Sequence, residues 1–558
     1  MTDAPSRTPP RGRRILFRLV LVVSPVLLFL LAELVVRVVA PRQGSDDPYL
    51  RLSGTSSRFG EVEIAGERWF RVQHADLYAQ NNVHFRVEKP KGTLRVFCLG
   101  GSAAAGWPHT GEQTFSAYLA QALRAAYPDR TVEVLNVGAH GYPSYRVRGV
   151  LEEVIRFQPD LLVLWCGNNE FVENRSYAKS GGVKRLVDAL NRRSRLFEIL
   201  LGTVAEVVAP TPKLDADMRE AGVFIFSQLE QLALELRTDP AQLASVIGHY
   251  RFTIASMVAS AREARVPLLL MTVPVNLRDW HPNVSRNGVQ GEPLARWRER
   301  YQAGALALQE GRAVDAIAAL RDARAADPTH AETAFLLGKA LVAAGDCDAA
   351  RAELVAAKDL DLTPFRAISA LNDVLREIAG GDEELIFVDM ERALLAGAKD
   401  CAPGFEWFLD YVHPTKAGNL EIARRLFDAL VERATLGAPA TRSFTRQDDG
   451  YDDATDLSVQ LHVLLLHFFM HQEQSFVDCA ERCIALVSAN AADPSQDPLV
   501  QLLREGRDGM TAILEQRRRA LRGEELAADA EARHQDWYRA YYGRVKTVVD
   551  AVRGGAGR

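Results

Sequence analysis

The sequence predicts an α/β domain with a parallel sheet, joined to helical segments and preceded by one apolar helix. Three observations predict this arrangement. Short apolar runs alternate with segments of helical spacing after residue 93, as they do in βαβ units. A 34-residue repeat fills the interval between the last two apolar runs. An uncharged apolar stretch follows a group of arginines near the N-terminus.

Length and composition limit the possible classes of protein. A chain of 558 residues is too long for one compact core, so we expect two to four domains. With 47% hydrophobic and 25% charged residues, the chain is expected to fold rather than to remain disordered. The formal net charge is −5 and no long basic stripe occurs, so no nucleic-acid partner is expected.

The six cysteines give no pattern of a metal site, because none are paired with C-x-x-C spacing. We expect most of them to be buried thiols that pack as small hydrophobic groups. Cys98 and Cys166 end two strands that we expect to be neighbours. A disulfide between these two is compatible with the pattern but is not predicted by it.

The N-terminal segment is predicted to be a membrane anchor. Residues 1–18 form a basic tail with five arginines and one acid, and residues 19–40 are predominantly apolar. A stretch of about 22 residues is long enough to cross a bilayer core of about 30 Å. The positive-inside rule then keeps the N-terminus in the cytoplasm and places the remaining chain outside it, in the periplasm. A cleaved signal peptide is the alternative, although Pro41 after Ala40 is unfavourable for cleavage.

The next residues are expected to form an irregular lead-in, 41–92, followed by the α/β domain. Helical spacing is found at 113–127 and 145–157. Pro267 is expected at the beginning of a strand, where a missing donor is tolerated. The domain is expected in two parts, 93–290 and 381–436. Its strands are predicted from five apolar runs, at residues 94–99, 131–137, 160–166, 266–273 and 384–388.

Residues 291–380 separate the two parts of the α/β domain and contain the repeat. Segments 297–328 and 331–362 resemble two tetratricopeptide (TPR) helical hairpins, because the repeat has that family's period. Phe365, Ile368 and Leu371 form the stripe of an expected capping helix. Two repeats are too few to be stable alone, so we expect them to pack on the α/β domain; they could also bind a protein partner. A generic alanine-rich helical insertion is the alternative. The repeat pairs are Gly304 with Gly338, Gly311 with Gly345, Ala316 with Ala350, Leu320 with Leu354, Ala323 with Ala357, and Asp327 with Asp361.

Residues 437–558 are predicted to be a helical C-terminal region. His462 and His467 lie five residues apart, a spacing that does not place both on one face of a helix. We therefore interpret them as structural histidines. The sequence predicts no role for this region.

The first chemically informative segment runs from Gly100 to Gly106, directly after the first expected strand of the domain. A serine at a glycine-rich turn between strand and helix, here Ser102, lies at the carboxyl edge of a parallel sheet, where ligands bind in such folds. Backbone N–H groups of the turn can face a developing negative charge. The segment lacks the lysine of a phosphate-binding P-loop.

Two further segments end the next two strands and should reach the same edge of the sheet. Residues 136–141 end in Gly141, and residues 167–171 contain Asn169. An asparagine amide can donate a hydrogen bond to an oxyanion without adding charge. Capping and turn formation are the alternative for both segments.

The fourth segment places Asp410 three residues before His413, after the fifth strand. On a turn, both side chains can face one site. The carboxylate can then orient the imidazole, and the imidazole can accept a proton from a serine.

Together the four segments resemble the SGNH hydrolase superfamily of GDSL esterases, whose sequence blocks occur here in the same order and with the spacing G-x-S-x-x-x-G. The resemblance implies a flavodoxin-like sheet and a serine esterase that needs no metal or organic cofactor. Ser102 would be the nucleophile, His413 the base and Asp410 its orienting carboxylate. The oxyanion donors would be the Ser102 and Gly141 N–H groups and the Asn169 amide.

The sequence departs from the family pattern in two blocks. Gly-Gly-Ser-Ala stands where Gly-Asp-Ser-Leu is usual, and Gly-Asn-Asn-Glu where Gly-x-Asn-Asp is usual. Neither change affects a residue of the implied triad or oxyanion hole, but both leave the substrate open. Trp107, Arg278 and Trp280 are weaker candidates for substrate contact, with simple loop packing as the alternative.

The expected function is a membrane-anchored esterase acting on an acyl ester. The anchor and the family analogy suggest an O-acyl group, acetyl being one candidate, on an envelope carbohydrate or lipid. One alternative is an O-acetyltransferase, in which a sugar hydroxyl replaces water. Another is a TPR-type interaction protein with a relic active site.

Overall fold

The computed structural model describes most of the chain after residue 58. The chain divides into two compact units, one of residues 1–56 and 175–220 and the other of residues 57–174 and 221–558. The described residues are 59–72, 83–109, 111–172, 233–447, 449–490, 493–524 and 529–556 in the larger unit, and 23–24, 27–37, 39, 194 and 196–197 in the smaller one.

In the smaller unit, residues 27–37 are helical. The Glu33 carboxylate is buried and accepts hydrogen bonds from Ser194 Oγ and Leu196 N, each at 2.8 Å, and from Arg37 Nε at 2.7 Å. Among the described residues, no helix combines the length and apolar character needed to cross a membrane. The predicted anchor at 19–40 lies only partly within them.

The larger unit is built on the parallel sheet that the sequence predicts. Its five strands lie in the order β5-β4-β6-β7-β8, and every pair is parallel. Both faces of the central strands are covered, which explains why their sequences are continuous apolar runs. Pro267 directly precedes β7, as expected. The strands are β4 (Thr93–Gly100), β5 (Thr131–Asn136), β6 (Leu161–Trp165), β7 (Leu268–Met271) and β8 (Ile386–Val388).

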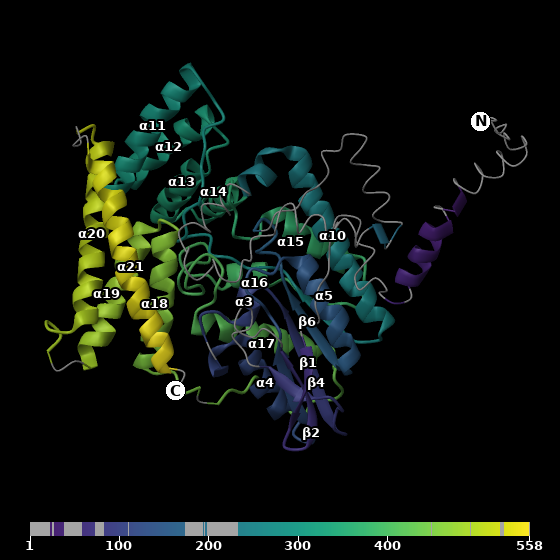
Figure 1. The fold of residues 1–558 in the computed structure, drawn as a ribbon. Coiled ribbons are helices and arrows are strands. Elements are labelled where there is room, and N and C mark those ends of the chain that lie inside the picture. Colours follow the sequence, from purple (N-terminus) through teal and green to yellow (C-terminus); the bar gives the residue numbers. More distant parts are fainter. Residues whose placement is uncertain are drawn as a thin grey trace, which may run out of the picture. The chain divides into compact units, whose positions relative to one another are not determined.

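Helices cover both faces of this sheet (Figure 1). α4 (Phe115–Ala126) packs with α17 (Lys416–Glu432), and α5 (Ser144–Val154) packs with α10 (Pro240–Glu263), which also contacts α15 (Ser369–Gly380). Helix α17 follows the Asp-x-x-His segment, so the chain after the insertion returns to the sheet that the N-terminal part began. Short helical segments complete the domain: α3 (Ser102–Ala105), η1 (Gly111–Gln113), η2 (Ile155–Phe157) and α16 (Met390–Ala396).

The described part of the lead-in segment, residues 59–72 and 83–92, forms regular strands, where the sequence interpretation expected irregular structure. β1 (Phe59–Ile64), β2 (Glu67–Val72) and β3 (His84–Arg86) form a separate antiparallel sheet. Ala65 and Gly66 connect the first two strands, both with positive φ, which is the conformation of a two-residue hairpin turn. The alternation in residues 59–72 around an Ala-Gly pair was the signal for a hairpin.

The insertion forms the two expected helical hairpins, α11 (Glu292–Gln309) with α12 (Ala313–Ala326) and α13 (Ala331–Ala344) with α14 (Cys347–Leu360). The repeated glycines explain their close packing. A Cβ on Gly304 would lie 2.5 Å from Leu320, and one on Gly338 would lie 2.7 Å from Leu354.

The expected capping helix differs in its beginning. Helix α15 starts only at Ser369, so Phe365 and Ile368 precede it and only Leu371 of the predicted stripe lies within it. Ile368 is the N-cap of this helix and has extended backbone, with a φ of −70° and a ψ of 156°.

The C-terminal region consists of α18 (Asp453–Phe469), α19 (Glu473–Asn490), α20 (Pro498–Leu521) and α21 (Ala530–Ala556). Buried residues of all four helices, among them Leu464, Cys483, Met510 and Tyr541, form one apolar core. The region is therefore a helical bundle with its own core.

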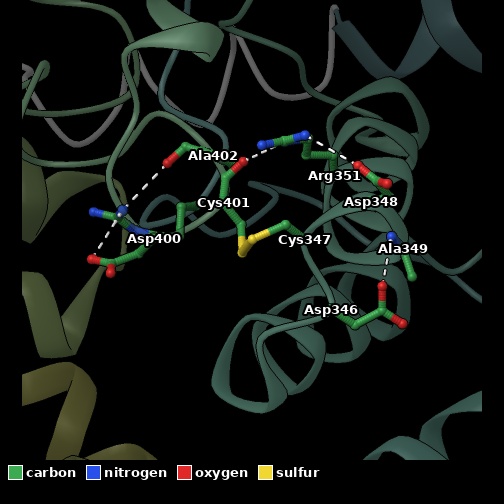
Figure 2. Close-up of a disulfide and its surroundings, with 9 residues drawn as sticks. Asp346, Cys347, Asp348, Ala349, Arg351, Asp400, Cys401 and Ala402 are labelled. Atoms are coloured by element: carbon green, nitrogen blue, oxygen red, sulfur yellow. Dashed lines mark hydrogen bonds and ion pairs between the residues drawn. A yellow bond between two sulfur atoms is a disulfide. The ribbon is translucent and has the colours of Figure 1, made fainter.

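A disulfide joins the insertion to the α/β domain (Figure 2). Cys347 at the start of α14 is bonded to Cys401, and Arg351 Nε donates a 2.6 Å hydrogen bond to the Cys401 carbonyl. The other four cysteines are buried free thiols, in agreement with the expectation for most of the six. The structure pairs neither Cys98 nor Cys166. No sequence pattern predicts the observed pair, whose members are 54 residues apart.

Candidate active site

The candidate site lies where the strand order of the sheet reverses. After β4 the chain proceeds to β5 on one side and then to β6 on the other, so β4 lies between them. The loops after these three strands carry Ser102, Gly141 and Asn169 respectively. Ligands bind at such a switch point outside the carboxyl ends of the strands.

The structure brings Ser102, His413 and Asp410 into a hydrogen-bonded chain. His413 Nε2 lies 2.8 Å from Ser102 Oγ, and His413 Nδ1 lies 2.6 Å from Asp410 Oδ2. Ser102 is half-buried, whereas His413 and Asp410 are buried. Because the carboxylate accepts from Nδ1–H, Nε2 carries the lone pair that can accept the serine proton.

The local turn fixes the Asp410 carboxylate. Its Oδ1 atom accepts hydrogen bonds from the backbone N–H groups of Val412 and His413, both at 2.8 Å. Asn276, in the loop after β7, donates to the Asp410 carbonyl at 3.0 Å. These bonds hold the ionised carboxylate in position to orient the imidazole.

The serine loop is supported from below by Asn136 at the end of β5. Its side-chain amide donates to the Ala104 carbonyl at 2.8 Å and to Ser116 Oγ at 2.9 Å. A Cβ on Gly138 would lie 2.5 Å from the Ala105 nitrogen, so this glycine permits the β5 loop to approach α3.

Asn169 and Tyr142, the residue after Gly141, lie beside Gly101 in the serine loop. Asn169 Nδ2 donates to the Tyr142 carbonyl at 3.1 Å and would lie 2.4 Å from a Cβ on Gly101, the residue before Ser102. Gly141 is exposed and has a φ of +67°, which favours glycine. The site therefore combines an amide, an exposed backbone N–H and a serine on adjacent loops.

Glu170, which replaces the usual aspartate of the family pattern, has a structural role here. Its fully buried carboxylate accepts hydrogen bonds from Ser144 N at 2.7 Å and Ser144 Oγ at 3.0 Å. It thus ties the loop carrying Asn169 to the beginning of α5.

Arg278 and Trp280, two of the weaker candidates for substrate contact, pack against neighbouring side chains. Arg278 is 9% exposed, and its guanidinium donates to Asp279 Oδ2 at 2.8 Å and to Glu406 Oε2 at 2.6 Å. Trp280 is fully buried, with its ring 5.1 Å from that of Tyr411. Neither residue presents an open face to solvent, and the substrate contact suggested for both stays a prediction.

Trp107, by contrast, is half-buried and lies beside the histidine. Its ring centroid is 4.5 Å from that of His413, in an edge-to-face arrangement. Tyr411 also packs edge-to-face on the His413 ring, at 5.7 Å. Aromatic rings therefore flank the imidazole.

His109 is a buried neighbour that the sequence did not identify as important. Its Nε2 donates to the Pro414 carbonyl at 3.1 Å, next to His413. Burial lowers the pKa of His109 to about 4; the Pro414 hydrogen bond and Asp456 oppose this shift, while His413 and Lys416 add to it. His109 is neutral at physiological pH and supports the backbone of the histidine turn.

The buried thiols are not activated nucleophiles, because burial raises the pKa of both Cys98 and Cys166. The part of the chain that the structure describes holds no cluster of three or more metal-ligating side chains.

Comparison with known families identifies this domain. The family model of the GDSL-like lipase/acylhydrolase family matches residues 98–237. The chain contains a GDSL-like acylhydrolase domain. This family assignment makes it an ester hydrolase. A tetratricopeptide repeat model matches residues 307–371, which confirms the TPR interpretation of the insertion.

Among curated proteins, none matches the sequence. The chain is similar to solved structures of variants of an acetyl-xylooligosaccharide esterase from Geobacillus stearothermophilus. One match has a TM-score of 0.29 at 14% identity and covers 61% of this chain and 96% of the other. A second has 0.29 at 13%, covering 65% and 100%. A catalytic mutant described as an acetylxylan esterase has 0.27 at 15%, covering 65% and 100%.

Proposed function

We propose that the protein is a membrane-anchored serine esterase that removes an O-acyl group from an envelope carbohydrate or lipid. Ser102, His413 and Asp410 form its triad. The observation that supports the triad most strongly is the short contact between His413 Nε2 and Ser102 Oγ, 2.8 Å across 311 residues of sequence. Folding alone does not require a buried His–Asp pair to be hydrogen-bonded to a half-buried serine, so the arrangement indicates a catalytic role.

The proposed reaction has two steps. Ser102 Oγ attacks the ester carbonyl carbon while His413 Nε2 takes its proton, and Asp410 stabilises the imidazolium. The Ser102 and Gly141 N–H groups and the Asn169 amide would hold the oxyanion. As the C–O bond breaks, the alcohol leaves with the proton from His413. Water, deprotonated by His413, then releases the acid from Ser102.

The proposed location rests on two features. The basic tail and apolar segment of residues 1–40 would anchor the chain with its N-terminus in the cytoplasm. The Cys347–Cys401 disulfide is compatible with an oxidising compartment such as the periplasm. An envelope substrate follows from this location, and acetyl is the acyl group we favour.

The function can be tested with a fluorophosphonate probe and a panel of 4-nitrophenyl esters of increasing acyl length. We expect the probe to label the folded protein and activity to be highest for the acetyl ester. Ser102→Ala should abolish both labelling and hydrolysis. Ser245→Ala, which removes the hydroxyl of a half-buried serine on α10, is the matched control and should retain both.

Two outcomes would redirect the proposal. Absence of labelling at Ser102 in folded protein would favour an interaction protein with a relic site. If an acceptor sugar diverted most of the acetyl group from water to a sugar hydroxyl, the protein would be an O-acetyltransferase instead.

A further inference from the structure

The C-terminal bundle reaches the serine loop through its first helix, α18. The ring of His462 lies 6.4 Å from the ring of Trp107, edge-to-face, and Trp107 in turn packs on His413 at 4.5 Å. One indole ring therefore lies between the imidazole of the site and a side chain of the C-terminal region.

Leu466 extends this contact along the same face of α18, because residues four apart on a helix are neighbours. It packs against the buried cluster of Trp280, Phe365 and Met470. Tyr411 and Val172 pack against that same cluster. Tyr411 lies two residues before His413, and Val172 lies three residues after Asn169, so α18 borders the loops that carry both parts of the proposed machinery.

The helix is held firmly in this position. The ring of His467, on α18, lies with Nε2 3.2 Å from the Leu409 carbonyl, one residue before Asp410. The segment leading into α18 is fixed through the buried Asp449 carboxylate, which accepts from Tyr118 Oη at 2.6 Å and from Lys416 Nζ at 2.8 Å. A site border on an anchored helix keeps a defined distance from the reacting atoms.

The chemistry tells which part of the ester this border meets. In acyl transfer, His413 Nε2 must lie next to the leaving alcohol oxygen in order to return its proton. The oxyanion donors Gly141 and Asn169 instead face the carbonyl oxygen. Side chains gathered around the His413 ring therefore line the alcohol side. Trp107, His462 and Leu466 are all half-buried, so each retains surface that a substrate can contact.

From this arrangement we infer that α18 selects the alcohol portion of the substrate, with His462 and Leu466 as specificity-determining residues. The inference rests on the proposed esterase function. The aromatic and aliphatic surfaces favour an alcohol with a flat, partly apolar face, as a sugar ring presents. The acyl group lies on the other side of the scissile bond and is not selected by α18.

The test compares two substrate series in the full-length protein. One series varies the alcohol with acetyl constant: ethyl acetate, 4-nitrophenyl acetate and an acetylated pentose. The other varies the acyl group with 4-nitrophenol constant. Leu466→Ala should raise kcat/KM for the acetylated sugar relative to ethyl acetate, and Leu466→Trp should lower that ratio, each by roughly tenfold. His462→Ala should also change this ratio.

The acyl-length profile should stay as in wild type, because the alcohol is the same throughout that series. The deacylation rate of the acetyl-enzyme should also stay unchanged, because the alcohol has already left. Opposite effects of a smaller and a larger residue at one position cannot both arise from loss of stability. Leu465→Ala is the matched control, since Leu465 packs into the bundle core and should change neither series.

The outcomes separate this inference from the proposed function. If the wild type hydrolyses esters through Ser102 but the α18 variants leave the alcohol preference unchanged, or alter the acyl-length profile instead, the inference is wrong and the esterase stands. If Ser102 is not required for hydrolysis by the wild type, the proposed function itself fails.

Discussion

The absence of a side chain at Gly101 leaves room for the Asn169 amide next to Ser102. A Cβ at position 101 would lie 2.4 Å from Asn169 Nδ2, whereas the Gly101 backbone has a φ of −84° that any residue can adopt. Gly101→Ala should therefore displace the amide with little loss of stability. We expect kcat for an acetyl ester to fall about 100- to 1000-fold with little change in KM, as for loss of one oxyanion donor.

A double-mutant cycle checks this explanation. Asn169→Ala alone should lower kcat by a similar factor, and Gly101→Ala should add little in its presence, because the amide that it displaces is already gone. Full additivity of the two effects would show that Gly101 acts on something other than the amide.

His109 should make the fold sensitive to mild acid. Its pKa of about 4 in the folded protein lies below the ordinary value of about 6.5, so between these values the unfolded chain binds more protons. The free energy of unfolding is therefore highest above about pH 6.5, where the ring is neutral in both states. It decreases as the pH falls toward 4, by roughly 3 kcal/mol in total. We expect the unfolding temperature to decrease between pH 7 and pH 4.5.

His109→Gln supplies the comparison, because glutamine can donate a hydrogen bond but does not titrate. The variant should lose less stability than wild type over this interval. A residual slope is expected, since burial also lowers the pKa of His330 and His467. Parallel pH profiles for variant and wild type would rule out the buried His109 as a source of the acid sensitivity.

At the scale of elements, the disulfide links the TPR insertion to the loop that leads to Asp410. The bonded cysteines are 54 residues apart in the sequence. By limiting the entropy of the unfolded chain, a cross-link over a loop of this length stabilises the folded protein by roughly 4 kcal/mol. Cys347→Ser combined with Cys401→Ser should therefore lower the unfolding temperature of the purified protein. Reduction of the wild type should have the same effect.

An ion pair also joins the insertion to the α/β domain, so we expect loss of the disulfide to have little effect on activity. Lys339 on α13 donates to Asp279 Oδ1 at 2.9 Å, and Asp279 also binds the buried Arg278. Although burial favours a higher pKa, Arg278 and Lys339 hold the pKa of Asp279 at about 2, so this link persists at neutral pH. The double serine variant should thus retain kcat at 25 °C. A large loss of kcat without unfolding would mean that the disulfide positions the site directly.

The elements also explain what the sequence could predict. Ser102 and Asn169 were recognisable because each closely follows a strand whose apolar run is unambiguous, and parallel strands bring their carboxyl ends to one edge. His413 was recognisable through the order of sequence blocks in the family that the chain resembles. Cys347 and Cys401 were not, because pairing across an insertion depends on how it folds back. The contact between His462 on α18 and Trp107 could not be predicted either, because an amphipathic pattern shows that one face of a helix is buried but not which surface covers it. The burial of Arg278 could not be predicted, because its ion-pair partner Glu406 lies 128 residues later in the sequence.

At the scale of the whole molecule, the insertion and the C-terminal bundle are both attached to the α/β domain that carries Ser102. The α/β domain supplies the hydrogen-bonded chain of Ser102, His413 and Asp410. The Cys347–Cys401 disulfide joins the TPR insertion to the loop that precedes Asp410. The C-terminal bundle contributes α18 beside Trp107. The insertion and the bundle are therefore parts of the proposed enzyme and not separate attachments.

The distribution of cysteines allows the proposed location of the chain to be tested. Four of the six cysteines are buried free thiols, and two form the disulfide. If the anchor exports the larger unit, protein denatured without reductant should react with a PEG-maleimide at four thiols. A version without residues 1–40, kept in the reducing cytosol, should react at six. The variant with serine at positions 347 and 401 should react at four in both cases. Six reactive thiols in the full-length, membrane-associated chain would mean that the larger unit stays in the cytoplasm, and the envelope substrate would then have to be abandoned.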